Sequence, residues 1–221
     1  ITTVVIDAFT PQESLNPKFD GRSYALSAAS QKMLSALGLW DDLASHAEPM
    51  VEIKVSDGAA GEMPSPFVMQ FGDEDFSQGP MGFMVEDRHL RARLAKAVDM
   101  SGVTFRTGQI ITGQTIHPTH VTVTIEGHHP LTAAVLVGAD GRNSRTAKMA
   151  KLTRTGWDYD QSSLVCAIAH EKPHHGIAHQ FFMPSGPLAI LPLTQNRSGI
   201  VWTEQRQVAQ NIHNLSDEDY L

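Results

Sequence analysis

The sequence is poor in cysteine and has no long apolar run, and each shortage excludes a class of protein. Cys166 is the single cysteine among 221 residues, which excludes an internal disulfide framework, and its apolar neighbours Val165 and Ala167 favour a buried thiol over a nucleophile. The longest apolar stretch, 133–139, is far shorter than the roughly 18 residues needed to span a bilayer. No basic segment followed by an apolar one marks a secretory signal. We therefore expect a reducing compartment, by default the cytoplasm.

An excess of basic residues is also missing. Lys and Arg number 17 against 24 Asp and Glu, which gives a formal net charge of -7. No stretch combines basic and aromatic residues, so binding to nucleic acid has no electrostatic support. The hydrophobic fraction of 41% is enough for a proper core, in one large domain or in two small interleaved ones.

The most informative segment present is Leu136-Val-Gly-Ala-Asp-Gly-Arg-Asn-Ser144. An apolar run that ends in an acid and a glycine predicts a strand whose carboxyl end presents a carboxylate and backbone amides, as in the nucleotide sites of open α/β sheets. The alternative is that Asp140-Gly141 is a reverse turn and nothing more. The segment alone does not choose between the two.

The first seven residues, Ile1-Thr-Thr-Val-Val-Ile-Asp7, predict a strand rich in β-branched side chains that ends in a carboxylate. An acid at the end of the second strand of a dinucleotide-binding βαβ unit accepts hydrogen bonds from a ribose hydroxyl. No Gly-x-Gly-x-x-Gly stands before Asp7. Either Asp7 is an ordinary strand-end residue, or the strand, glycine turn and helix that precede it in such a unit lie outside this sequence.

Patterns further along the chain predict a mixed α/β protein in which two kinds of layer alternate. Helical spacing indicates helices over 27–39 and 87–100, and alternation indicates strands over 51–55 and 67–71. Short alternating strands over 103–137 predict an antiparallel meander, and a short basic helix follows Ser144. We expect one further antiparallel sheet from four strands, 163–170, 177–183, 187–193 and 198–203.

Histidine suggests a metal site, because the chain has 11 of them and His174-His-Gly-Ile-Ala-His179 places three close together. No carboxylate or cysteine stands at ligand spacing around them. We therefore predict a solvated turn here and no metal.

Several segments, taken in order, carry a family resemblance. Five of them are Asp20-Gly-Arg-Ser-Tyr-Ala-Leu26, Leu37-Gly-Leu-Trp40, Val85-Glu-Asp-Arg-His-Leu90, Val137-Gly-Ala-Asp-Gly-Arg-Asn-Ser144 and Ser185-Gly-Pro-Leu-Ala-Ile-Leu-Pro-Leu193. With these, the chain resembles the flavin-dependent aromatic hydroxylases of the para-hydroxybenzoate hydroxylase fold. Three further segments, Trp157-Asp-Tyr159, Ala178-His-Gln180 and Ile200-Val-Trp202 after the strand 185–193, make it most similar within that group to the ubiquinone-biosynthesis hydroxylases.

The resemblance implies a domain plan. It divides the chain into a partial Rossmann-like FAD-binding portion with a β-meander, over 1–50 and 86–155, and an antiparallel substrate-binding sheet, over 51–85 and 156–221. Two parts of the family pattern are absent from the sequence: the glycine-rich phosphate loop before Asp7 and a Gly-Asp-Ala segment after the second sheet. The sequence thus looks like the middle of such an enzyme, and binding of FAD by this chain alone is left open.

The resemblance also implies cofactor contacts. Asp7 would hold the adenosine ribose of FAD, and Arg22 would contact the pyrophosphate, whose oxygens suit a guanidinium fork. Arg88 would be a further flavin contact, and Asp140 with Gly141 matches a motif that the family associates with FAD and NAD(P)H. The family commonly has a basic residue three positions after the serine of that motif, where this sequence has alanine, so contact with the pyridine nucleotide is in doubt.

The chemistry that the resemblance implies belongs mainly to the cofactor. NAD(P)H would reduce FAD, and molecular oxygen would then supply the hydroxyl group of an aromatic ring, here a polyprenyl phenol. No catalytic side chain and no metal are expected. The second sheet would form the substrate pocket, although ordinary core positions are an alternative for each of its residues, Gln180, Phe182, Leu188, Ile190 and Leu193.

Two other functions remain open at this stage. The chain could be a noncatalytic interaction module of the same fold that does not bind FAD by itself, or a flavin hydroxylase of another aromatic substrate. A polyprenyl substrate would also fit peripheral contact with a membrane or with other enzymes of the pathway, but no basic amphipathic helix indicates it.

Overall fold

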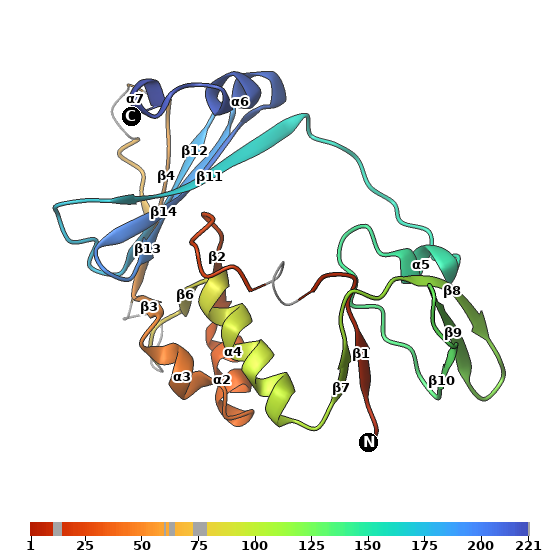
Figure 1. Cartoon of the computed structure of the whole chain (residues 1–221). Helices are drawn as coiled ribbons and strands as arrows, with labels where there is room; N and C mark the ends of the chain where they lie inside the picture. Colours follow the sequence, from red (N-terminus) through yellow and green to blue (C-terminus); the bar gives the residue numbers. More distant parts are fainter. Residues whose placement is uncertain (11–14, 60, 62–64, 73–78, 221) are drawn as a thin grey trace. The chain divides into compact units, whose positions relative to one another are not determined.

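The computed structural model describes residues 1–221 except 11–14, 60, 62–64, 73–78 and 221. The fold is mixed α/β with several sheets, as the sequence predicts (Figure 1). Two compact units form: the first comprises Ile1–Asn16 and Lys96–Trp157, the second Pro17–Ala95 and Asp158–Leu221. Within the described residues, no helix is both long enough and apolar enough to cross a membrane.

The helices and strands follow one another in short segments. In chain order they are β1 Val4–Ile6, β2 Ser23–Ser27, α2 Ala28–Ala36, α3 Trp40–Ala44, β3 Ala47–Met50, β4 Glu52–Asp57, β5 Met69–Phe71, β6 Gly82–Glu86, α4 Asp87–Met100, β7 Thr104–Arg106, β8 Ile111–Ile116, β9 Val121–Ile125, β10 Leu131–Ala133, α5 Arg145–Met149, β11 Gln161–Ala169, β12 Ile177–Met183, β13 Gly186–Leu193, β14 Arg197–Gln205, α6 Arg206–His213 and α7 Asp217–Tyr220.

The first unit contains a parallel strand pair and a meander. β1 pairs in parallel with β7, and β8, β9 and β10 form an antiparallel sheet. The predicted meander therefore begins later than expected, because residues 104–106 pair with the first strand instead. Strand β9 alternates as its sequence predicts: Val121, Val123 and Ile125 are buried and form the core of this unit. Ile6 and Leu136 both pack against that core.

The strand predicted from Leu136 to Ala139 is wrong. Residues 135–139 lie outside any strand, and no described strand pairs with them. Leu136 is half-buried on the meander, whereas Val135 and Val137 are 73% and 78% exposed. An apolar run specifies a preference for burial, but a strand forms only where a second backbone supplies hydrogen bonds.

A six-stranded sheet in the order β11-β14-β13-β12-β4-β5 forms most of the second unit (Figure 1). The four predicted strands from 163 to 203 are all present in it, and the strands predicted over 51–55 and 67–71 form the antiparallel pair β4 and β5. One feature differs: β4 runs parallel to β12. The sheet is therefore mixed, because β4 reaches β12 from a distant part of the chain, where no hairpin dictates the direction.

A smaller sheet, β2-β6-β3, packs on the larger one. Met84 of β6 and Met50 of β3 are buried against Ala178 and Leu193 of the six-stranded sheet. Helix α4 begins directly after β6 at the predicted position, and α2 is capped by Ser27, whose hydroxyl accepts a hydrogen bond from an amide in the first turn. The end of β6 thus lies at the start of α4, in the small sheet that packs on the six-stranded sheet.

The two compact units differ from the predicted functional portions between 17 and 50, between 86 and 95 and at 156–157. Residues 17–50 and 86–95 group with the six-stranded sheet, because β2, β6 and β3 hydrogen-bond to one another and bury their methionines there. The division of the chain into cofactor-binding and substrate-binding portions stays a prediction.

Candidate functional site

Asp140, in the segment that the sequence singled out, holds its own turn together. One carboxylate oxygen accepts a hydrogen bond from the hydroxyl of Ser144, and the other accepts from the amide of Thr146 at 3.0 Å and from its hydroxyl at 3.1 Å. The Ser144 hydroxyl, followed by the Thr146 amide, keeps the pKa of this carboxyl far below its ordinary value. The loop before α5 is therefore ordered around an ionised carboxylate.

Asp7 and Gly141 both lie in loops of the first unit. Asp7 follows Ile6 at the end of β1, and its carboxylate accepts a hydrogen bond of 2.9 Å from the amide of Phe9. Gly141 has φ +77, and a methyl group added to it would meet no atom within 4 Å. Because Ile6 and Leu136 pack on the same core, the meander positions both loops.

Arg22 comes from the loop before β2 in the second unit and is held by Asp20. Its Nε donates to the carboxylate of Asp20 at 2.8 Å, and a second nitrogen approaches Asp87 at 3.4 Å. The side chain of Arg22 is still 52% exposed. The hydrogen bond between the two groups lowers the pKa of Asp20 and raises the pKa of Arg22. Arg22 is thus pre-oriented and remains accessible to a ligand.

Asp87, the first residue of α4, is buried among polar partners. It accepts a hydrogen bond of 2.6 Å from the hydroxyl of Tyr24 and forms an ion pair of 2.6 Å with Arg91. The hydrogen bond to Asp87 raises the pKa of Tyr24. Because Asp87 is at the N-terminus of the helix, its negative charge also interacts favourably with the helix dipole.

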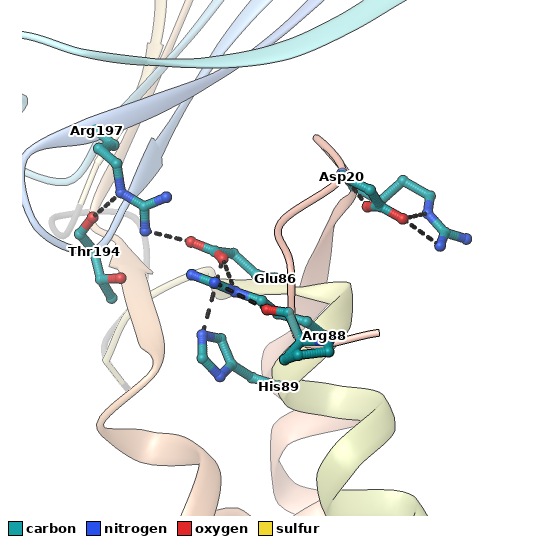
Figure 2. A network of polar contacts seen from close by, with 8 residues as sticks. Asp20, Glu86, Arg88, His89, Thr194 and Arg197 are labelled. Carbon is teal, nitrogen blue, oxygen red and sulfur yellow. Dashed lines mark hydrogen bonds and ion pairs between the residues drawn. The ribbon is translucent and has the colours of Figure 1, made fainter. Parts of the chain in front are cut away.

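Arg88 lies beside a second buried carboxylate, that of Glu86. Figure 2 shows Arg88 and Arg197 meeting at Glu86, with His89 beneath it. Arg88 donates to Glu86 at 2.7 Å, Arg197 donates to its other oxygen, and Glu86 is only 2% exposed. Both guanidinium groups stand 5.6 Å from the ring centre of Phe19. The predicted cofactor residue Arg88 therefore belongs to a network of charged side chains.

Sequence reasoning missed Glu86, Arg197 and Phe19. The pair Glu86-Asp87 at the start of the predicted helix over 87–100 was a usable signal, because adjacent acids need cationic partners when buried. The sequence around Arg197 carries no such signal, because 111 residues separate it from Glu86. Only the packing of the two sheets brings the two together.

The residues predicted to line the substrate pocket do not all lie on one face of the six-stranded sheet. Successive residues of a strand point to opposite faces. Along β13, Leu188 and Ile190 therefore project to one face, and Leu193 projects to the other. Leu193 thus lies on the opposite face from Leu188 and Ile190, and the role of all three as pocket residues stays a prediction. In the sequence all three are apolar residues of one predicted strand, so composition does not separate them.

The other two predicted pocket residues lie on the face of Leu193. Gln180 pairs with Ala189 and Phe182 pairs with Pro187, and these partners occupy alternate positions with Leu193 along β13. The same face carries the core contacts with Met50 and Met84. Gln180, Phe182 and Leu193 thus share the face on which the sheet β2-β6-β3 packs, and their role as a pocket stays a prediction.

The histidines of the 170–179 region bind backbone and side-chain groups. The ring nitrogens of His170 lie 2.7 Å from the carbonyl of Lys172 and 2.9 Å from the hydroxyl of Ser198. His174 lies 3.0 Å from the carbonyl of Leu193 and accepts from the amide of Gly176. Across the residues that the structure describes, no group of three or more His, Cys, Asp or Glu is arranged to hold a metal ion.

Comparisons with known proteins give one consistent result. A family model described as "FAD binding domain" matches residues 1–220. The ubiquinone hydroxylase UbiL of Rhodospirillum rubrum is 34% identical over 221 residues, which cover 100% of this chain and 50% of that protein. The mitochondrial ubiquinone biosynthesis monooxygenase COQ6 of Danio rerio is 29% identical over 216 residues, which cover 92% of this chain and 43% of that protein. The chain thus spans about half the length of the curated relatives it matches.

Solved structures agree on the fold. The structure of PqsL, a probable FAD-dependent monooxygenase from Pseudomonas aeruginosa, matches with a TM-score of 0.76 at 17% identity, covering 95% of this chain and 55% of that one. Klebsiella pneumoniae HpxO in complex with FAD and uric acid matches with a TM-score of 0.69 at 16% identity, covering 93% of this chain and 56% of that one.

Proposed function

Because the chain belongs to the FAD-binding-domain family, whose model matches residues 1–220, we propose that it forms the flavin- and substrate-holding part of an enzyme that hydroxylates an aromatic ring in ubiquinone biosynthesis. The cofactor is FAD, the reductant NAD(P)H and the oxidant molecular oxygen. The observation that carries the proposal is this match along the whole chain, supported by relatives named as ubiquinone hydroxylases over 92% or more of it.

The charged residues described above fit the parts of FAD. Arg22 and Arg88 expose 52% and 30% of their side chains, and guanidinium groups bind phosphate oxygens through two parallel hydrogen bonds. Asp7 at the end of β1 suits a ribose hydroxyl, since its carboxylate only accepts hydrogen bonds. Gly141 leaves open space in front of its backbone, which permits close approach of a phosphate.

Bound FAD would supply the redox chemistry, so the protein needs no nucleophile and no metal of its own. The chain would bind and orient the ring of the substrate and exclude water from it. We place the substrate on the face of the six-stranded sheet that bears Gln180 and Phe182, because β6, which leads to Arg88, packs on that face through Met84. The amide of Gln180 can donate to or accept from a phenolic hydroxyl.

The substrate that we propose is a polyprenyl phenol. The side chain of Phe182 is 53% exposed and that of Val165 is 48% exposed, so apolar surface is available on strands of the proposed substrate face. A ring with an apolar chain would bury such surface. Peripheral contact with a membrane or with other enzymes of the pathway, and a location in the cytoplasm, remain part of this proposal.

Titration of the purified chain with FAD, followed by flavin fluorescence and the visible spectrum, tests the proposal. We expect saturation near one FAD per chain. We also expect the variants Arg22→Ala and Asp140→Ala to weaken binding about tenfold or more, the effect of losing a charge-assisted contact or the loop that presents one. Arg206→Ala is the matched control, because Arg206 forms ion pairs with exposed Asp158 and Asp160.

The outcomes separate the candidate functions. A chain that FAD does not bind would overturn the proposal for this chain and favour the noncatalytic interaction module. Unchanged affinity in both site variants would show that the site is placed wrongly. A saturable flavin site that oxidises NAD(P)H faster with an aromatic compound other than a polyprenyl phenol would favour a hydroxylase of another substrate.

A further inference from the structure

The buried carboxylate of Glu86 is shared by two arginines from distant elements. Arg88 comes from the first turn of α4 and Arg197 from the first position of β14, and each donates to a different oxygen of Glu86 (Figure 2). One negative charge thus faces two positive charges. The guanidinium groups expose 30% and 19% of their side chains, whereas the carboxylate exposes 2%. The surplus positive charge is therefore on the side open to solvent or to a ligand.

The remaining contacts of Arg88 fix a single pose. A second nitrogen of Arg88 donates to the carbonyl of Pro17 at 3.2 Å, and the ring of Phe19 lies at cation-π distance. An arginine has five N–H donors. Among the described residues, Glu86 and Pro17 accept from two of those of Arg88, which leaves three N–H groups without an acceptor there.

Arg197 is itself held in place by the turn that precedes it. Its Nε donates to the carbonyl of Thr194 at 3.2 Å. The two residues between them, Gln195 and Asn196, have φ +64 and +54, the left-handed geometry of a tight connection between antiparallel strands. Arg197 therefore reaches Glu86 from a rigid part of the six-stranded sheet.

We propose that Arg197 is a positioning residue for Arg88. Because Arg197 occupies one oxygen of Glu86, Arg88 binds the other oxygen singly and keeps its outer nitrogens for the phosphate of the cofactor. Without Arg197, Arg88 is the one arginine left on a buried carboxylate that His89 approaches only at 3.9 Å, and two parallel hydrogen bonds to Glu86 become its best arrangement. This inference rests on the proposed contact between Arg88 and FAD, and it makes the substrate sheet part of the flavin site.

A merely structural tie between the two sheets predicts a different pattern. If the contact only held the two sheets together, replacing Arg197, Glu86 or both would lower the stability of the protein by the same amount. The positioning role predicts compensation instead: once the carboxylate is neutral, the removal of Arg197 no longer draws Arg88 away from the ligand.

FAD titration of four proteins tests the proposal: wild type, Arg197→Met, Glu86→Gln and the double variant. We expect Arg197→Met to weaken FAD binding on the order of tenfold, a coupling within the range of residues in direct contact. The double variant should bind within about threefold of wild type. Arg206→Met, the same substitution immediately after β14, should leave the affinity unchanged. A double variant that binds FAD as weakly as Arg197→Met, or more weakly, would overturn the proposal.

Arg197→Lys keeps the test informative if the methionine variant unfolds. The lysine retains the charge beside Glu86, so we expect FAD affinity within about threefold of wild type; a loss equal to that of Arg197→Met would contradict the positioning role. The Nε–H resonance of Arg88, measured by NMR without flavin, gives a second readout. We expect it to shift in Arg197→Met and to move back in the double variant. A resonance that does not respond would overturn the inference even where the wild type binds FAD, whereas failure of the wild type to bind overturns the proposed function.

Discussion

Gly82, the first residue of β6, has no room for even one added carbon atom. A Cβ at this position would lie 2.4 Å from the carbonyl oxygen of Leu26 and 3.1 Å from the terminal methyl group of Met50, whereas ordinary contacts begin near 3.4 Å. The methionine can move, because its side chain is flexible. The carbonyl belongs to β2, which is hydrogen-bonded to β6, so the backbone of one strand must shift by about 1 Å.

We expect Gly82→Ala to destabilise the protein by about 2–3 kcal/mol, the upper part of the usual cost of overpacking. For a chain of this length, that loss lowers the melting temperature by about 5–10 °C. The matched control is Gly113→Ala in β8, where the added atom would meet its nearest neighbour, the hydroxyl of Thr124, at 3.4 Å. This control should lie within about 0.5 kcal/mol of wild type.

Urea unfolding followed by circular dichroism, with thermal melts as a second probe, measures both variants. A Gly82→Ala protein within 0.5 kcal/mol of wild type, on the scale of an ordinary surface substitution, would refute the packing that we describe between β2 and β6. So would equal destabilisation by the control. Because β6 ends at Glu86, the same shift should also weaken FAD binding if Arg88 contacts the cofactor.

Three further predictions concern single groups. The Ser144 hydroxyl holds the pKa of Asp140 far below its ordinary value, so the ionised carboxylate contributes its full stability above the pKa of the unfolded chain and loses it as the pH falls through the pKa of the folded protein. The difference in unfolding free energy between wild type and Asp140→Asn should therefore narrow below about pH 4. A difference that stays constant down to pH 3 would contradict this. Ser27→Ala should cost about 1 kcal/mol by removing the cap of α2, measured by urea unfolding; no loss would mean that the cap is not formed in solution. Because His170 and His174 use their ring nitrogens within the protein, dialysis against EDTA should leave the melting temperature unchanged, and a lower value would reveal a metal.

Local patterns predicted the elements well wherever one strand or one helix carries its own signal. The helix over 87–100 begins and ends where its spacing indicates, and the buried valines of β9 alternate as their sequence does. Period and turn residues are local properties, and they hold in almost any tertiary context. The motif at Asp140 was also found from sequence, since its turn is closed by Ser144 and Thr146, only four and six residues away.

Properties that depend on a distant partner were not predictable in the same way. The apolar run at 136–139 has the composition of a strand, but no described strand pairs with it. Leu188 and Leu193 look alike in sequence, and the register of β13 sends them to opposite faces. Composition measures how apolar a segment is, whereas pairing and facing depend on what lies beside it.

The sequence by itself determined the class of the fold, the family resemblance and the residues Asp7, Arg22, Arg88, Asp140 and Gly141 as candidates for a flavin site. Only the tertiary structure decided how the candidate Arg88 is held. The acid that binds it is two residues away, but the second arginine on that acid is 111 residues away on another sheet. Coupling of this kind arises because a buried carboxylate must find its counter-charges wherever packing brings them, and packing follows from the whole chain at once.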